Sequence, residues 1–124
     1  MKNGKFVILC VDDDQDLLDA LRLVLEKHGY AMVEARSAEH GLRRWQEVGP
    51  DLIIVDLMME EVDAGTSLVR NLKASGNTRP VYMLSSVGES LNSNIDYNEL
   101  GLAGVFQKPI DHQQLLTVLR AKLK

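Results

Sequence analysis

The pattern of apolar and polar positions alternates between two kinds of segment. Short runs of consecutive apolar residues are typical of strands buried on both faces of a parallel sheet. Such runs are Phe6–Val11, Tyr30–Ala35, Leu52–Val55, Val81–Leu84 and Ala103–Gln107. Between most of them, apolar residues recur three or four positions apart, as on one face of a helix. The chain therefore predicts five strands alternating with helices.

The expected helices begin at residues suited to an N-cap and end at glycine or at basic residues. The boundary residues are Asp12–Asp14, His28-Gly29, Ser37, Gly49-Pro50, Ser75–Asn77, Asp111 and Lys122. Parallel strands need crossover helices, so we expect an α/β fold with a doubly wound parallel sheet and helices on both faces. Residues 87–101 are rich in Ser, Asn and Gly, and we expect them to be irregular.

Length, charge and cysteine content narrow the class of protein. The 124 residues suit one domain spanning residues 1–124. A net charge of −4 argues against non-specific binding of nucleic acid. The single cysteine, Cys10, cannot form an internal disulfide and is expected to be a small buried hydrophobe. No apolar segment is long enough to span a bilayer and no signal peptide is recognisable, so we expect a cytoplasmic protein without membrane contact.

Polar residues stand where four of the expected strands end. Asp12–Asp14, Asp56, Ser85 and Lys108 follow the first, third, fourth and fifth apolar runs. In an open parallel sheet, ligands bind at the carboxyl ends of the strands. We therefore expect these side chains to meet at one edge of the sheet.

This set of residue types predicts magnesium-assisted phosphoryl chemistry. Clustered carboxylates repel one another, and without histidine or cysteine nearby their oxygens favour Mg²⁺. With the ion bound, an aspartate can attack phosphorus while Lys108 and the ion neutralise the transferred group. The Ser85 hydroxyl can bond a phosphoryl oxygen only when one is present, which suggests a switch.

The whole chain resembles the receiver domain of bacterial two-component response regulators, including the chemotaxis regulators. The resemblance rests on four motifs in order along the chain: ILCVDDDQDLL, IIVDLMM, VYMLSS and QKPI. It implies the flavodoxin-like strand order 2-1-3-4-5. It also implies a histidine kinase or phosphotransfer protein as partner, a downstream protein target, and homodimerisation through a face formed by the segment before the last strand, that strand and the last helix.

The resemblance also implies a role for each site residue. Asp56 would accept phosphate from a phosphohistidine, and Asp12, Asp13, Asp56 and the Met58 backbone carbonyl would hold Mg²⁺. Ser85 would be the switch hydroxyl. Lys108, joined to Pro109 by a cis peptide, would bind the phosphoryl group. Such a protein catalyses only its own phosphorylation and dephosphorylation.

The chain departs from the family pattern in two places. Glu60-Glu61 replace the usual Pro-Gly, and Asp63-Ala64-Gly65 contains one residue more than the usual Asp-Gly. Val105 stands where the family has a switch aromatic, and strand alternation would turn the neighbouring Phe106 to the opposite face. We expect phosphorylation to be intact and its relay to be altered.

Two other functions compete with this interpretation. A degenerate receiver would act as a docking or dimerisation module that needs no phosphorylation. A phosphatase similar to haloacid dehalogenases would use Asp12 as nucleophile and Asp14 as acid/base, although Asp14 and Asp16 also suit helix capping. The last helix reaches the end of the sequence, so we expect no output domain within it.

Overall fold

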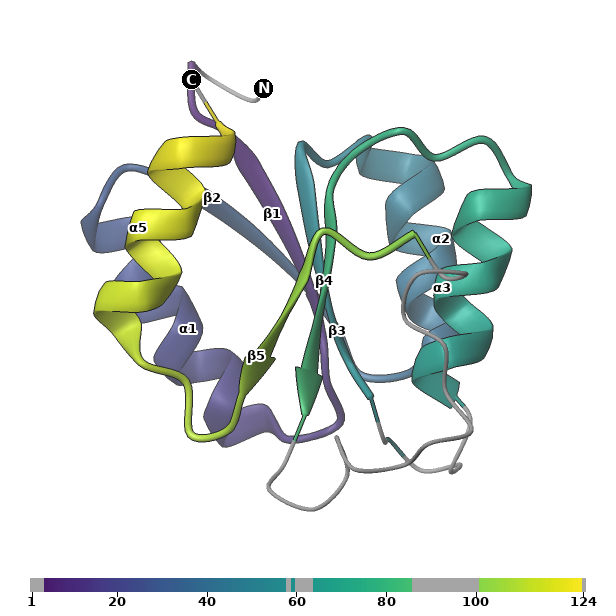
Figure 1. The fold of residues 1–124 in the computed structure, drawn as a ribbon, viewed down its shortest axis with the longest axis horizontal. Coiled ribbons are helices and arrows are strands. Elements are labelled where there is room, and N and C mark those ends of the chain that lie inside the picture. Colours follow the sequence, from purple (N-terminus) through teal and green to yellow (C-terminus); the bar gives the residue numbers. More distant parts are fainter. Residues whose placement is uncertain (1–3, 58, 60–63, 86–100, 124) are drawn as a thin grey trace.

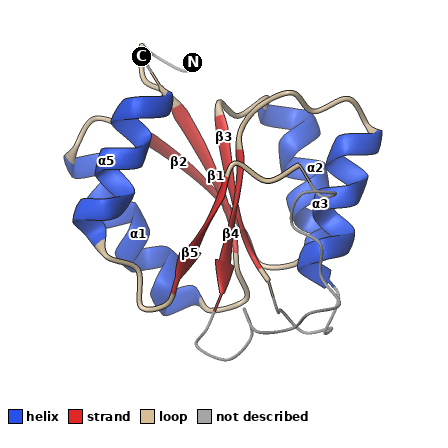
Figure 2. Ribbon diagram, in the orientation of Figure 1, coloured by secondary structure: helices blue, strands red, loops and turns tan. Residues whose placement is uncertain are grey.

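The computed structural model describes residues 4–57, 59, 64–85 and 101–123. Five parallel strands form one sheet in the order β2-β1-β3-β4-β5, with helices on both sides (Figure 1, Figure 2). The strands are β1 Val7–Val11, β2 Ala31–Ala35, β3 Leu52–Asp56, β4 Val81–Ser85 and β5 Gly104–Gln107. The expected fold class and strand order are both confirmed.

The helices make a layer on each side of the sheet. They are α1 Gln15–Lys27, α2 Ala38–Val48, α3 Ala64–Ala74 and α5 His112–Lys122. Figure 1 shows α1 and α5 on one side and α2 and α3 on the other. Each layer closes its own apolar core against the sheet, and all five residues of β1, β3 and β4 are buried. Burial on both faces explains why these strands are continuous apolar runs.

Side-chain caps start three of the helices as the sequence predicts. Asp14 accepts hydrogen bonds from the Asp16 and Leu17 amides at the start of α1. Ser37 accepts one from the His40 amide, and Asp111 caps α5. These caps satisfy amides that have no partner within the helix.

The second strand is shorter at its start than the apolar run suggests. Tyr30 lies outside β2 because its amide donates to the Leu25 carbonyl and so completes the end of α1. Ala31 is the first residue of β2 and donates to the Phe6 carbonyl. The hydrogen bond that ends α1 therefore uses the amide of Tyr30 and leaves this residue out of the strand.

Neighbouring residues of β5 face opposite cores, as strand alternation predicts. Val105 packs with the core under α2 and α3, whereas Phe106 is buried on the side of α1 and α5. The Phe106 ring stacks on that of Tyr82, with centroids 5.1 Å apart. Phe106 therefore does not replace an aromatic side chain at position 105.

Cys10, the lengths of the helices and residues 87–101 are each the subject of a sequence expectation. Cys10 is buried in the core, where desolvation raises the pKa of its thiol to about 12, so it is an inert packing residue. Among the described helices, none has the length and apolar character needed to cross a bilayer. Residues 87–100 of the segment expected to be irregular lie outside the described residues.

Candidate functional site

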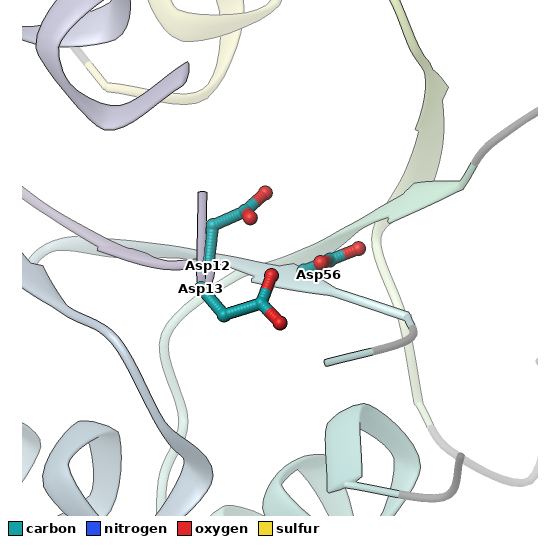
Figure 3. A group of neighbouring side chains, drawn as sticks. All are labelled: Asp12, Asp13 and Asp56. Carbon is teal, nitrogen blue, oxygen red and sulfur yellow. The ribbon is translucent and has the colours of Figure 1, made fainter. Parts of the chain in front are cut away.

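Three carboxylates meet at the carboxyl ends of β1 and β3. One carboxylate oxygen from each of Asp12, Asp13 and Asp56 lies within 4.8 Å of the others. Figure 3 shows the three side chains converging from the end of β1 and the end of β3. Asp12 and Asp56 are buried, and Asp13 is partly exposed. The sequence-predicted acids are therefore brought together, with one side of the cluster open.

The register of the sheet explains why these residues meet. Val11 of β1 pairs with Val55 of β3, and an aspartate directly follows each of them. The amide of Asp12 donates to the Ala35 carbonyl at 3.0 Å, which extends the β2 ladder to the start of the loop. The chain thus turns into α1 only after Asp12 has been fixed by the sheet.

Lys108 provides the positive charge of the site. It directly follows β5, and its Nζ lies 3.1 Å from Asp56 Oδ1 and 3.2 Å from Asp12 Oδ2. Burial lowers the pKa of the Lys108 ammonium, but Asp12 and Asp56 together outweigh burial and raise it. The peptide bond to Pro109 is cis, as expected. Lys108 is therefore a charged bridge between two buried carboxylates.

Ser85 lies next to this group on β4. Leu84 pairs with Asp56, so Ser85 stands one residue further along the neighbouring strand. Its side chain is buried, and its carbonyl accepts a 2.8 Å hydrogen bond from the Lys108 amide. Ser85 is thereby tied through the backbone to the residue that bridges the acids.

The two oxygens of Asp12 have different surroundings. Oδ1 accepts a 2.9 Å hydrogen bond from the Asp14 amide. Oδ2 is buried and has no hydrogen-bond partner among the described residues by geometry, and its nearest charge is the Lys108 ammonium, 3.2 Å away in an ion pair. Burial raises the pKa of the Asp12 carboxyl, while the Asp14 amide and Lys108 oppose the rise. A buried oxygen of this kind fits a metal ligand.

The donor set as a whole fits Mg²⁺. Carboxylate oxygens are the hard ligands this ion prefers, and it usually takes only one or two carboxylates and keeps several waters. Asp12 and Asp13 together with Asp56 offer such oxygens, and the partly exposed Asp13 leaves room for water. Met58, Glu60, Glu61 and Asp63 lie outside the described residues.

Asp12→Asn should make the metal-free protein more stable at about pH 7. Folding raises the pKa of the Asp12 carboxyl, so the folded protein holds this proton more tightly than the unfolded chain does. Above the unfolded pKa of about 3.9, the charged form of Asp12 therefore destabilises the folded state. Asparagine removes that charge while Asp56 still pairs with Lys108, so we expect the free energy of unfolding to rise. The gain should disappear as the pH falls through the raised pKa of Asp12 towards its unfolded value. Urea unfolding with a chelator present measures this, and a less stable variant at neutral pH would contradict the expectation.

Asp14 does not join the carboxylate cluster as an acid/base partner. Its side chain accepts from the Asp16 and Leu17 amides, which directs its oxygen to the start of α1. This capping role agrees with one of the two sequence interpretations of Asp14. It weighs against the arrangement that a phosphatase using Asp12 would need.

Two residues near the site had no role in the sequence analysis. Gly65 in the first turn of α3 lies against the carbonyl groups of Asp56 and Leu57, closely enough that a Cβ would overlap them. Arg36 donates from Nη2 to the Asp13 carbonyl at 3.2 Å. The unusual Asp-Ala-Gly motif could have drawn attention to Gly65, but nothing in the sequence pattern marks Arg36.

The sequence of the chain matches the family model described as the response regulator receiver domain over residues 8–120. The transcriptional regulatory protein ResD of Bacillus subtilis (strain 168) is 32% identical over 117 residues, covering 94% of this chain and 48% of the relative. The transcriptional regulatory protein GlrR of Escherichia coli (strain K12) is 35% identical over 108 residues, covering 87% of this chain and 24% of the relative. The chain thus spans half or less of these relatives.

Solved structures agree with the sequence comparison. A response regulator receiver domain protein from Clostridium thermocellum is 26% identical, has a TM-score of 0.84 and covers 95% of this chain and 94% of its own. A CheY-like receiver domain protein from Methanospirillum hungatei JF-1 is 26% identical, has a TM-score of 0.82 and covers 97% of this chain and 94% of its own. The likeness extends over nearly the whole chain.

Proposed function

Because the chain belongs to the family of response regulator receiver domains, which work in two-component systems, we propose that it accepts a phosphoryl group on Asp56 and switches protein contacts in response. The observation that carries the proposal is the convergence of Asp12, Asp13 and Asp56 on one edge of the sheet, with Lys108 Nζ 3.1 Å from Asp56 Oδ1. Such a site combines a nucleophile, a cation site and a fixed positive charge.

The transfer step is a displacement at phosphorus by the Asp56 carboxylate. An oxygen of Asp56 forms a bond to phosphorus while the bond between phosphorus and the imidazole nitrogen of a kinase phosphohistidine breaks. The imidazole leaves with the electron pair and takes a proton. Asp56 suits this role because it is the last residue of a buried strand and is held rigidly by the sheet.

The acids beside Asp56 would hold the metal ion. Asp12, Asp13 and Asp56, with the Met58 backbone carbonyl, are the proposed ligands, and the buried Oδ2 of Asp12 supports this assignment. When bound, Mg²⁺ supplies positive charge to the oxygens of the transferred group. The acids would then serve to bind and orient the ion in front of Asp56.

Lys108 and Ser85 would respond to the phosphoryl group. The Lys108 ammonium already lies between two carboxylates and can shift to a phosphoryl oxygen when Asp56 is modified. The Ser85 hydroxyl would bond another phosphoryl oxygen and so move the end of β4. A phosphoryl group that binds Ser85 at the end of β4 and Lys108 directly after β5 can shift the protein between two conformations.

The proposed function also includes a domain extent, a cellular location, a phosphodonor and a dimer face. We expect residues 1–124 to form one receiver domain in the cytoplasm, with a histidine kinase or phosphotransfer protein as phosphodonor. The proposed dimer face combines β5, α5 and the segment before β5, most of which lies outside the described residues. Because Val105 stands where other family members have the switch aromatic, we propose that phosphorylation is relayed to the output surface in a different way.

Intact mass after incubation with acetyl phosphate and Mg²⁺ tests the proposal. We expect one phosphoryl adduct on the natural sequence, none on Asp56→Asn and none when a chelator removes the metal. Asp16→Asn is the matched control, because it removes an exposed carboxylate outside the cluster and should leave the adduct in place.

Other outcomes would redirect the proposal. A folded protein that forms no adduct would favour the docking module. An adduct that survives Asp56→Asn, or hydrolysis of a small phosphate ester that is lost only in Asp12→Asn, would favour the phosphatase. The capping role of Asp14 is the structural observation against that last outcome.

A further inference from the structure

We propose that Arg36, the exposed residue that directly follows β2, is a positioning residue that holds the metal-binding loop, and that it strengthens Mg²⁺ binding although it carries a positive charge. This inference rests on the proposed function of the acidic site. It starts from the contact between Arg36 Nη2 and the backbone carbonyl of Asp13, at 3.2 Å.

Two consecutive residues at the end of β2 hold two consecutive residues of the acidic loop. The carbonyl of Ala35 accepts from the Asp12 amide at 3.0 Å, and the next residue, Arg36, donates to the carbonyl of Asp13. The first contact continues the sheet, whereas the second is made by a side chain after the sheet has ended. Arg36 therefore adds a contact to the loop one residue beyond the last hydrogen bond of the sheet.

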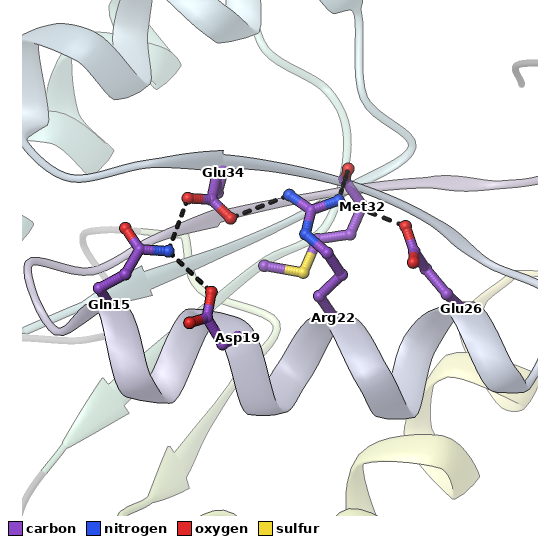
Figure 4. A network of polar contacts seen from close by, with 6 residues as sticks. All are labelled: Gln15, Asp19, Arg22, Glu26, Met32 and Glu34. Carbon is purple, nitrogen blue, oxygen red and sulfur yellow. Dashed lines mark hydrogen bonds and ion pairs between the residues drawn. The ribbon is translucent and has the colours of Figure 1, made fainter.

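The Glu34 side chain of β2 also holds the start of α1, where the same loop ends. Gln15 Nε2 donates to Glu34 Oε2 and to Asp19 Oδ1, both at 2.9 Å. Glu34 is itself held by Arg22, whose Nη2 lies 2.9 Å from Glu34 Oε1 (Figure 4). Hydrogen bonds from Arg22 and Gln15 stabilise the ionised Glu34 carboxylate and so lower its pKa.

The loop between β1 and α1 is thus fixed at both ends by β2, and Arg36 adds a side-chain contact to the backbone of Asp13 between these ends. Asp13 is the most exposed of the three acids, so its position depends least on the core. A hydrogen bond to its carbonyl limits the rotation of the backbone that carries its side chain. Fewer conformations then have to be given up when the ion binds.

Charge and position make opposite predictions for Arg36. A guanidinium beside an acidic cluster repels a divalent cation, so the charge effect alone predicts that Arg36→Ala binds Mg²⁺ more tightly. Loss of the hold on Asp13 predicts weaker binding, since residues behind a metal ligand affect affinity by orienting it. The sign of the change in affinity therefore separates the two explanations.

Calorimetric titration of the full chain with Mg²⁺ alone tests the inference. We expect Arg36→Ala to raise the dissociation constant for Mg²⁺ about tenfold, the lower end of the effect of residues that orient a metal ligand. Arg36→Lys retains the charge and one donor and should recover part of the affinity. Arg120→Ala, which removes an exposed arginine in the last turn of α5, is the matched control and should bind as the natural sequence does.

A second readout separates positioning from general damage. The Mg²⁺ concentration that gives half-maximal phosphorylation should rise in Arg36→Ala, while the rate at saturating Mg²⁺ stays close to that of the natural sequence. A natural sequence that binds no Mg²⁺ would overturn the proposed function together with this inference. Binding by Arg36→Ala that is unchanged or tighter, with the natural sequence binding normally, would overturn this inference alone.

Discussion

Replacement of Lys108 by methionine is expected to lower the free energy of unfolding of the metal-free protein by about 3 kcal/mol near neutral pH. The ammonium lies 3.1 Å from Asp56 Oδ1 and 3.2 Å from Asp12 Oδ2, and both carboxylates are buried. Methionine matches the lysine side chain up to Cε and so retains its apolar part, but it lacks the charged Nζ. Two buried carboxylates would then face each other without a cation.

The pH dependence of this loss follows from the shifted pKa values. Folding raises the pKa of Lys108, so the stability it contributes is complete below its unfolded pKa of about 10.4 and is lost as the pH rises through the folded value. In Lys108→Met the loss should shrink as acid protonates Asp12, whose pKa is raised. Urea unfolding of both proteins between about pH 4 and 8 measures the difference.

Added Mg²⁺ should rescue the variant. An ion held by the same carboxylates restores positive charge, and a ligand at about a hundred times its dissociation constant stabilises the folded state by about 2.7 kcal/mol. Lys122→Met, in the exposed last turn of α5, is the control and should change stability by less than about 0.5 kcal/mol. If Lys108→Met and the natural sequence have equal free energies of unfolding without metal, the ion pairs of Lys108 with Asp12 and Asp56 contribute nothing to stability.

Gly65→Ala is expected to lower the free energy of unfolding by about 3 kcal/mol and to disturb the proposed phosphorylation site. An added Cβ would overlap the carbonyl oxygen of Asp56 and lie 2.6 Å from that of Leu57. Both obstacles are backbone atoms at the end of β3, where the Leu57 amide also donates to the Leu84 carbonyl at 2.8 Å. The methyl group can be accommodated only if α3 moves away from the strand that carries Asp56.

Gly41→Ala is the matched control for this prediction. Gly41 is a buried glycine of α2, and its added Cβ would meet side-chain methyl groups of Val11 and Leu68 rather than backbone. Alanine also favours a helix by about 1 kcal/mol over glycine, so we expect a net change within about 1 kcal/mol. Thermal unfolding and the rate of acetyl phosphate labelling should separate the two variants. Similar values for both would show that α3 shifts without cost.

Several features of the fold are encoded within single segments of the chain. The continuous apolar run Leu52–Val55 predicts a strand buried on both faces, and the structure buries every residue of β3. Ser37 predicts the start of a helix and caps α2. Alternation along β5 predicts that Val105 and Phe106 face opposite cores, as they do. Each of these follows from residues within one segment of the chain.

The strand order needed more than local pattern. Alternating strands and helices indicate a parallel sheet, but the order 2-1-3-4-5 came from the family resemblance carried by the four motifs. The apolar run from Tyr30 also predicts a start of β2 that is one residue too early, because the Tyr30 amide donates to the Leu25 carbonyl at the end of α1. An apolar run alone does not reveal which of its amides a preceding helix will use.

Local patterns along the chain therefore predict the elements, the class of sheet and the positions of the acids and the lysine at strand ends. Three contacts appear only in the folded chain: Lys108 bridges Asp12 and Asp56, Arg36 holds the Asp13 carbonyl, and Gly65 lies against the end of β3. Periodicity and capping depend on residues a few positions apart. Contacts between distant segments depend on the register of the strands and on how closely each helix packs against them.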